Sequence, residues 1–251
     1  MDKKTKEYLE ATAQAMNSVA IIEKLKQRIL DTHDTSNIPK KPRQFFQDEA
    51  IQKIYDTLYE FLTPGYFWED FIFMICNDIE IYDFTDTSSV GYVTQTDRAN
   101  VIKRLKPQKS ICYEKISLKE HTLNIIESFL KNYDSITQSI RFEVLCSCVL
   151  HDFGKSSALM QSVDPRLINE TYEHAQFSCN YVLHLKKKII KQFNGQILND
   201  QYYENQLTAI DRMAKGVLHH HKNTRYYGEI AYQVGIIDQK TREKEWYDHL
   251  G

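Results

Sequence analysis

The sequence of 251 residues contains no long apolar run, little glycine and proline, and almost no net charge. No run approaches the ~20 apolar residues that a membrane span needs, and Met1 is not followed by an apolar signal core. A net charge of −2 argues against bulk attraction to nucleic acid or to an anionic membrane. With 42% hydrophobic and 26% charged residues, the composition is typical of a globular protein with a substantial core.

The five cysteines are odd in number, and none of them forms a C-x-x-C pair. Cys146 and Cys148 lie in an apolar stretch, which is typical of small core residues. This pattern favours neither a disulfide framework nor a thiolate metal site, and we expect a reducing, cytoplasmic setting.

Apolar residues recur at helical spacing through most of the chain, and this periodicity predicts an all-α fold. The amphipathic helix at the N-terminus is expected to pack on the main domain, or on a partner such as a second copy of the chain. Residues 34–43 read as a linker, and residues 83–97 as a loop or short hairpin. The predicted helices cover about residues 3–32, 45–62, 66–81, 136–150, 201–221 and 228–246, with two more that begin near residues 117 and 171.

Helical spacing also places several histidines and an aspartate, which are common metal ligands, on the core-facing sides of the predicted helices. His121 lies three residues after Leu118 and four before Ile125, so these side chains share one helix face. Ser117, with Glu120 three residues later, forms a capping box that begins this helix. His219 falls on the opposite, polar face of its own helix and is expected to face water. Four further residues are expected to point inward: His174, His220, His221 and Asp238.

The apolar run that ends at Leu150 is followed by groups that suit a catalytic site. His151 and Asp152 are hard to bury without a partner, because uncompensated polar groups are costly in a core. Gly154 is predicted to stop the helix, and Lys155 adds a cation one turn beyond the carboxylate. The simplest arrangement is a metal held by His151 and Asp152, with Lys155 facing an anionic substrate.

Five separate segments therefore aim metal-type ligands at one helical core. A single one of these residues could be a hydrogen-bonded core histidine or a salt-bridged carboxylate. Five such segments on successive helices favour a shared binuclear centre bridged by Asp152. Imidazole and carboxylate ligands without thiolate favour two divalent ions of Mn, Fe, Ni or Zn. The predicted ligands are His121, His151, Asp152, His174, His220, His221 and Asp238.

The order of these residues resembles the HD superfamily of metal-dependent phosphohydrolases over about residues 115–245. His151-Asp152-Phe153-Gly154-Lys155 is the closest match, and the extra histidines are similar to the five-histidine branch that includes the HD-GYP phosphodiesterases. The resemblance implies an HD-type helical bundle in residues 111–251. Residues 1–110 are outside it, and their periodicity predicts a helical region of unassigned role. It also implies phosphoester hydrolysis at two metals, with Asp152 and Lys155 catalytic, Lys155 on the substrate phosphate and Asp238 completing the metal set.

The chain departs from the HD-GYP pattern at two points. Residues 222–228 lack the Gly-Tyr-Pro signature, so the resemblance does not point to cyclic di-GMP as substrate. Ser117 replaces a glutamate of that pattern, which weakens the case for a third metal. Within residues 222–228, Arg225 is a candidate phosphate clamp or a solvated loop arginine.

The expected substrate is a phosphorylated small molecule or nucleotide, and no membrane partner is expected. Nucleic acid is a less favoured partner, suggested by histidine-rich HD domains in some conjugative relaxases. Three other functions stay open at this point: a catalytically inactive HD-type regulatory or signalling scaffold, a DNA-processing, relaxase-like HD protein, and a di-iron oxygenase. The complete ligand set favours an enzyme.

Overall fold

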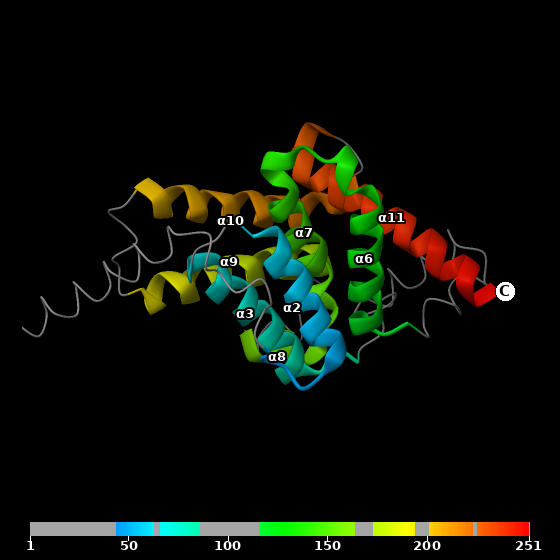
Figure 1. Ribbon diagram of the computed structural model, residues 1–251, viewed down its shortest axis with the longest axis horizontal. Helices are drawn as coiled ribbons and strands as arrows, with labels where there is room; N and C mark the ends of the chain where they lie inside the picture. Colours follow the sequence, from blue (N-terminus) through cyan, green and yellow to red (C-terminus); the bar gives the residue numbers. More distant parts are fainter. Residues whose placement is uncertain are drawn as a thin grey trace, which may run out of the picture. The chain divides into compact units, whose positions relative to one another are not determined.

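The computed structural model describes residues 44–62, 66–85, 116–163, 173–193, 201–222 and 225–250 (Figure 1). Within these ranges the regular elements are helices and no β-strand occurs, which confirms the predicted all-α fold. The α-helices are α2 (Glu49–Phe61), α3 (Tyr66–Tyr82), α6 (Leu118–Asn132), α7 (Arg141–Leu150), α8 (Ser157–Val163), α9 (His174–Gln192), α10 (Gln201–His219) and α11 (Glu229–Leu250). Short 3-10 turns are η1 (Tyr133–Ser135), η2 (Gln138–Ile140), η3 (Phe153–Lys155), η6 (His220–Lys222) and η7 (Arg225–Tyr227).

Several predictions from the sequence fall outside the described residues. These are the helix at 3–32, the linker at 34–43, all but the first residues of the loop at 83–97, and the domain boundary after residue 110. Residues 44–251 form one compact unit, and side chains of α2 and α3 lie in the same buried core as those of α6, α7, α9, α10 and α11. None of the described helices combines the length and apolarity needed to span a bilayer.

Helix α7 occupies the centre of this unit, in contact with α2, α6, α10 and α11 (Figure 1). Every residue from Glu143 to Leu150 is buried, and burial of each large apolar side chain contributes roughly 1.5–3 kcal/mol. The helix starts at Arg141 rather than at Ile136, because η2 precedes it. Since α7 ends at Leu150, the polar residues that follow it are delivered into the middle of the core.

Helix α6 begins where its sequence predicts. The Ser117 hydroxyl oxygen accepts a hydrogen bond from the Glu120 backbone N–H at 3.1 Å, and Leu118 is the first helical residue. This cap satisfies one of the donors that a helix leaves unpaired at its start. Leu118, His121 and Ile125 are all fully buried, as their spacing predicts.

Gly154 has a different role from the predicted helix stop. It lies in η3, four residues after α7 ends, and its backbone is not left-handed. A Cβ atom at Gly154 would lie 2.1 Å from the His174 carbonyl oxygen and 2.6 Å from the Phe177 Cβ. Glycine is required here because it allows the start of α9 to approach η3 closely, and this approach places His174 beside the residues that follow α7.

Candidate metal centre

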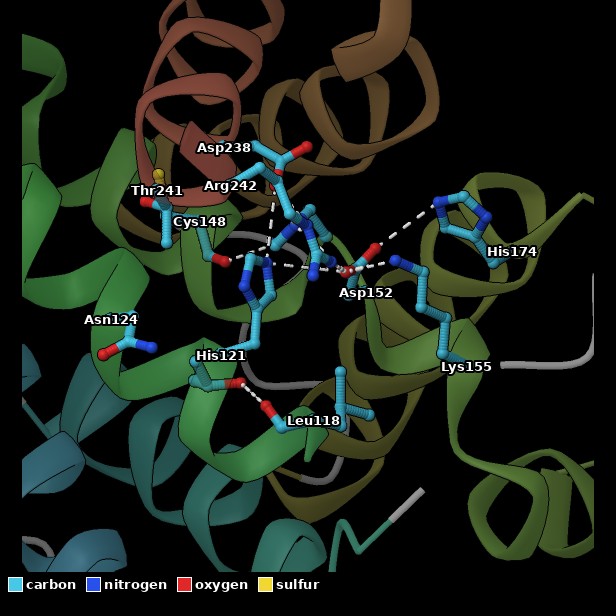
Figure 2. A network of polar contacts seen from close by, with 12 residues as sticks. Leu118, His121, Asn124, Cys148, Asp152, Lys155, His174, Asp238, Thr241 and Arg242 are labelled. Carbon is cyan, nitrogen blue, oxygen red and sulfur yellow. Dashed lines mark hydrogen bonds and ion pairs between the residues drawn. The ribbon is translucent and has the colours of Figure 1, made fainter. Parts of the chain in front are cut away.

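The described helices bring the seven predicted ligands to one place. Figure 2 shows four of them, His121, Asp152, His174 and Asp238, around the carboxylate of Asp152. The seven ligands come from five separate parts of the chain, and no two of these parts are adjacent in sequence. His121 lies on α6, His151 and Asp152 follow α7, His174 opens α9, His220 and His221 form η6, and Asp238 lies on α11.

His121, His151 and Asp238 form the first group of ligand atoms, and Asp152 lies beside it. His121 Nε2 lies 3.4 Å from Asp238 Oδ1 and 3.7 Å from Asp152 Oδ2. His151 Nε2 lies 3.4 Å from Asp152 Oδ2 and 3.7 Å from Asp238 Oδ1. Ligand atoms about 2.1 Å from one ion are about 3.0–3.4 Å apart at neighbouring positions, so this spacing is close to that of a coordination shell.

The second group of ligand atoms faces the other oxygen of Asp152. His174 Nε2 lies 3.4 Å from Asp152 Oδ1 and 2.8 Å from His221 Nε2. The ring of His220 completes this group, since its ligand nitrogen lies within 4.8 Å of those of His174 and His221. Asp152 therefore lies between the two groups, with Oδ2 near His121 and His151 and Oδ1 near His174, and it also lies close to His151 and His220 together.

Five atoms in these groups are buried without a hydrogen-bond partner among the described residues. An unsatisfied buried polar atom costs about 1–3 kcal/mol, so five of them in one place point to a ligand that satisfies them together. Divalent transition ions fit imidazole nitrogen and carboxylate oxygen. The five atoms are His121 Nε2, His151 Nε2, Asp152 Oδ1, His220 Nε2 and Asp238 Oδ1.

Backbone carbonyls orient two of the buried rings. His151 Nδ1 lies 2.7 Å from the Cys148 carbonyl oxygen, and His220 Nδ1 lies 2.6 Å from the Val217 carbonyl oxygen. A carbonyl oxygen only accepts, so each Nδ1 donates its hydrogen and leaves a lone pair on Nε2. Both Nε2 atoms then point into the site in the tautomer that binds metal.

Both carboxylates of the site stay ionised in spite of their burial. Burial opposes the ionisation of Asp152, but His151 and Lys155 beside it hold the pKa of its carboxyl well below the usual range. Burial also opposes the ionisation of Asp238, and its contacts with His121 and His151 hold its pKa well below the usual range. Ionised carboxylates are the form that coordinates metal.

The histidines of the second group are neutral in the metal-free site. Burial lowers the pKa of His220 to about 3, and His221 adds to this effect because two protonated rings could not lie side by side there. Burial and the nearby Lys155 lower the pKa of His174 well below its usual value. His151 differs, because Asp152 and Asp238 outweigh its burial and raise its pKa. A bound ion would have to displace a proton from His151 at mildly acidic pH.

Two cations, the buried Lys155 and the partly buried Arg242, contact the carboxylate of Asp152. Lys155 Nζ lies 2.6 Å from Asp152 Oδ2, and an Arg242 terminal nitrogen lies 3.1 Å from the same oxygen (Figure 2). Lys155 is 5% exposed, and its burial lowers the pKa of its ammonium although Asp152 opposes this change. Positive charge therefore lies directly beside the predicted bridging position.

The three adjacent histidines differ in their surroundings. His220 is fully buried, as predicted from its helix phase. His221 is exposed, and the prediction that it faces the core is wrong, although its Nε2 atom still reaches His174. The reason is that α10 ends at His219, and the residues after it turn with the tighter step of a 3-10 helix. His219 stacks on Tyr227, with ring centroids 4.4 Å apart, and is not part of either ligand group.

Arg225 lies apart from the ligand groups. Its Nε atom is 3.3 Å from Glu229 Oε2, its guanidinium covers the Tyr232 ring at 4.9 Å, and its side chain is 70% exposed. These contacts are those of a surface arginine on α11 and η7, and its assignment to substrate stays a prediction.

Two residues of the site were missed by reasoning from the sequence: Arg242 and Glu245. Both lie on α11, four and seven residues after Asp238, so they continue its face at helical spacing. This periodicity was the available signal. Arg242 contacts Asp152 and Asp238, and Glu245 contacts His121.

Comparisons with known proteins identify no relative of this chain. No protein-family model, no curated protein and no solved structure matches this chain. The geometry of the site and the resemblance carried by residues 151–155 are therefore the guides to function.

Proposed function

We propose that this chain is a metal-dependent phosphohydrolase that cleaves a phosphoester bond in a phosphorylated small molecule or nucleotide. The observation that carries the proposal is the position of Asp152. Its Oδ2 atom lies near His151 and its Oδ1 atom lies near His174. Lys155 and Arg242 both contact Oδ2. Two ligand groups joined by a carboxylate, with cations beside them, suit the chemistry of a phosphoryl group.

The proposed metals fit the residues present. The buried unpartnered atoms are imidazole nitrogens and carboxylate oxygens, which are ligands for Mn, Fe, Ni or Zn. The first ion would be held by His121, His151 and Asp238, and the second by His174, His220 and His221. Asp152 would be the ligand that both ions share, since it lies near His121, His151 and His174. When bound, two divalent ions would supply Lewis acidity and a water whose pKa is low enough for attack at neutral pH.

The chain itself supplies the remaining charge. Negative charge builds up on the phosphoryl oxygens in the transition state, and fixed cations in a dry site stabilise it. Lys155 acts as a compact point charge, whereas Arg242 presents a planar fork of donors that suits a phosphate. Both contact Asp152 Oδ2, so both lie next to the carboxylate that the two ions would share.

The test combines metal analysis with a substrate panel on the full chain. Protein stripped with a chelator is reloaded separately with Mn, Fe, Ni and Zn, and bound metal is counted by elemental analysis. Release of phosphate or alcohol is then followed with a phosphomonoester, a phosphodiester and nucleotides. We expect two ions per chain and metal-dependent hydrolysis of at least one substrate class.

Each alternative function gives its own result in this experiment. An inactive scaffold would bind metal and hydrolyse none of the substrates. An oxygenase would consume oxygen in the iron-loaded form without releasing phosphate. Protein that takes up no metal at all would refute the proposed centre.

A further inference from the structure

Glu245 is a buried carboxylate that does not belong to either ligand group. It lies near the end of α11 and is 2% exposed. Its Oε1 atom is 2.7 Å from His121 Nδ1 and 3.0 Å from Asn124 Nδ2, and its Oε2 atom is 3.4 Å from an Arg242 terminal nitrogen. Both oxygens are therefore engaged, and the partners on α6 lie more than 100 residues away in the sequence.

Helix periodicity explains why Glu245 can make these contacts. Asp238, Arg242 and Glu245 follow one another at four and three residues along α11, and His121 and Asn124 are three residues apart on α6. Side chains at these spacings share a helix face. Helices α6 and α11 pack against each other, so the face of α11 that carries Asp238 also carries Glu245 toward the back of the His121 ring.

The hydrogen bond at Nδ1 decides how His121 meets the site. An ionised carboxylate only accepts hydrogen bonds, so His121 must carry a hydrogen on Nδ1. The neutral ring then has its lone pair on Nε2, the atom that lies 3.4 Å from Asp238 Oδ1 and 3.7 Å from Asp152 Oδ2. The His151 and His220 rings are oriented by backbone carbonyls instead, so among these three buried rings only His121 depends on a side chain.

We infer that Glu245 is a positioning residue that holds His121 in the tautomer and orientation required of a metal ligand. The inference rests on the proposed metal centre and extends it to a residue outside the ligand set. A carboxylate behind a ligating histidine also makes the ring a stronger donor to metal, because the negative charge stabilises the positive charge that the ring shares with the ion. Arg242 contributes by contacting Glu245, Asp238 and Asp152 from one side chain.

A purely structural role for Glu245 makes a different prediction. The carboxylate could simply join α6 to α11 through Asn124 and His121. Its loss would then lower the melting temperature and leave the affinity of the folded protein for metal unchanged. A positioning role requires the affinity itself to fall.

The first measurement compares Glu245→Gln with a matched control on the same helix. Glu243→Gln is the control, because Glu243 is exposed and accepts a hydrogen bond from Gln239 rather than from a site residue. Zinc affinity is measured by competition with a chelating dye on folded, metal-stripped protein. We expect Glu245→Gln to bind zinc about 10–100-fold more weakly, Glu245→Asp to recover part of this loss, and Glu243→Gln to match the wild type.

The second measurement reads the His121 ring directly in metal-free protein. Long-range proton–nitrogen NMR distinguishes the two tautomers, and the His121→Gln variant assigns the signal. We expect a hydrogen on Nδ1 in the wild type and a mixture of tautomers in Glu245→Leu. Because this experiment needs neither metal nor turnover, it stays informative if the proposed activity is wrong.

These measurements distinguish a positioning role of Glu245 from a purely structural one, and both from a failure of the proposed function. Zinc affinity within twofold of the wild type in Glu245→Gln, with a lowered melting temperature, would overturn the positioning role. A hydrogen on Nε2 of His121 with none on Nδ1 in the wild type would overturn it as well. Wild-type protein that binds zinc but hydrolyses no phosphoester would refute the proposed function and leave the role of Glu245 to be decided by affinity.

Discussion

Replacing Asp152 with alanine removes the side chain that faces both groups of histidines. Asp152 Oδ2 lies 3.4 Å from His151 Nε2, and Asp152 Oδ1 lies 3.4 Å from His174 Nε2. Without the carboxylate, each group loses its shared ligand and the bound charge is less well compensated. We expect the variant to lose both ions and all metal-dependent turnover.

The same substitution also has a cost in the metal-free protein. Asp152 is the counterion of the buried Lys155 at 2.6 Å and of the partly buried Arg242 at 3.1 Å. Removing one partner of a buried pair leaves uncompensated charge and costs about 3–5 kcal/mol. At about 2–4 °C per kcal/mol for a chain of this size, the melting temperature should fall by about 6–20 °C.

Elemental analysis and thermal melting of one preparation test both parts of this prediction. Asp211→Ala is the matched control, because Asp211 is 52% exposed and pairs with Lys186 on the surface. Such pairs contribute about 0–1 kcal/mol, so this variant should keep its metal and nearly all of its stability. Full metal content in folded Asp152→Ala would refute the bridging geometry.

Three further predictions follow from the site. Lys155→Ala should keep its metals and lose about two to three orders of magnitude in turnover, since it removes one charge-stabilising group; near wild-type turnover at full occupancy contradicts the phosphate role. His220→Ala should lose metal and turnover. His219 is outside the ligand groups, so His219→Ala should keep both. Equal loss in both variants would contradict the orientation that the structure gives these two side chains. In metal-free protein, the free energy of unfolding should fall as the pH drops below about 6.5. The reason is that His220 takes up a proton in the unfolded chain but not in the folded protein, where its pKa is about 3. Denaturant unfolding at pH 6.5 and 5 should show about 2 kcal/mol less of this loss in His220→Gln, and an identical loss would rule His220 out as its source.

Reasoning from the sequence was most successful where the signal is local. The spacing of Leu118, His121 and Ile125 places them on one face, and all three are buried in the structure. A helix advances by a nearly constant angle per residue, so the face of a side chain can be counted within one element. Caps are equally local, and for this reason Ser117 marks the start of α6 correctly.

Local counting fails where an element changes its geometry. His221 was expected inside on the assumption that α10 continues through it, yet the helix gives way to a 3-10 turn after His219. Gly154 was interpreted as a helix stop, but the reason for glycine is the His174 carbonyl, which comes from another helix and has no trace in the local sequence.

The amino-acid sequence by itself determined that this chain is helical and that histidines and carboxylates on several helices face its interior. Only the tertiary structure decided which of those atoms meet. Asp152 turns its two oxygens to different histidine groups because α6, α7, α9 and α11 pack around it, and Glu245 reaches His121 because α11 lies along α6. Distances between segments far apart in sequence depend on helix packing, which many side chains set jointly, and so no single motif contains them.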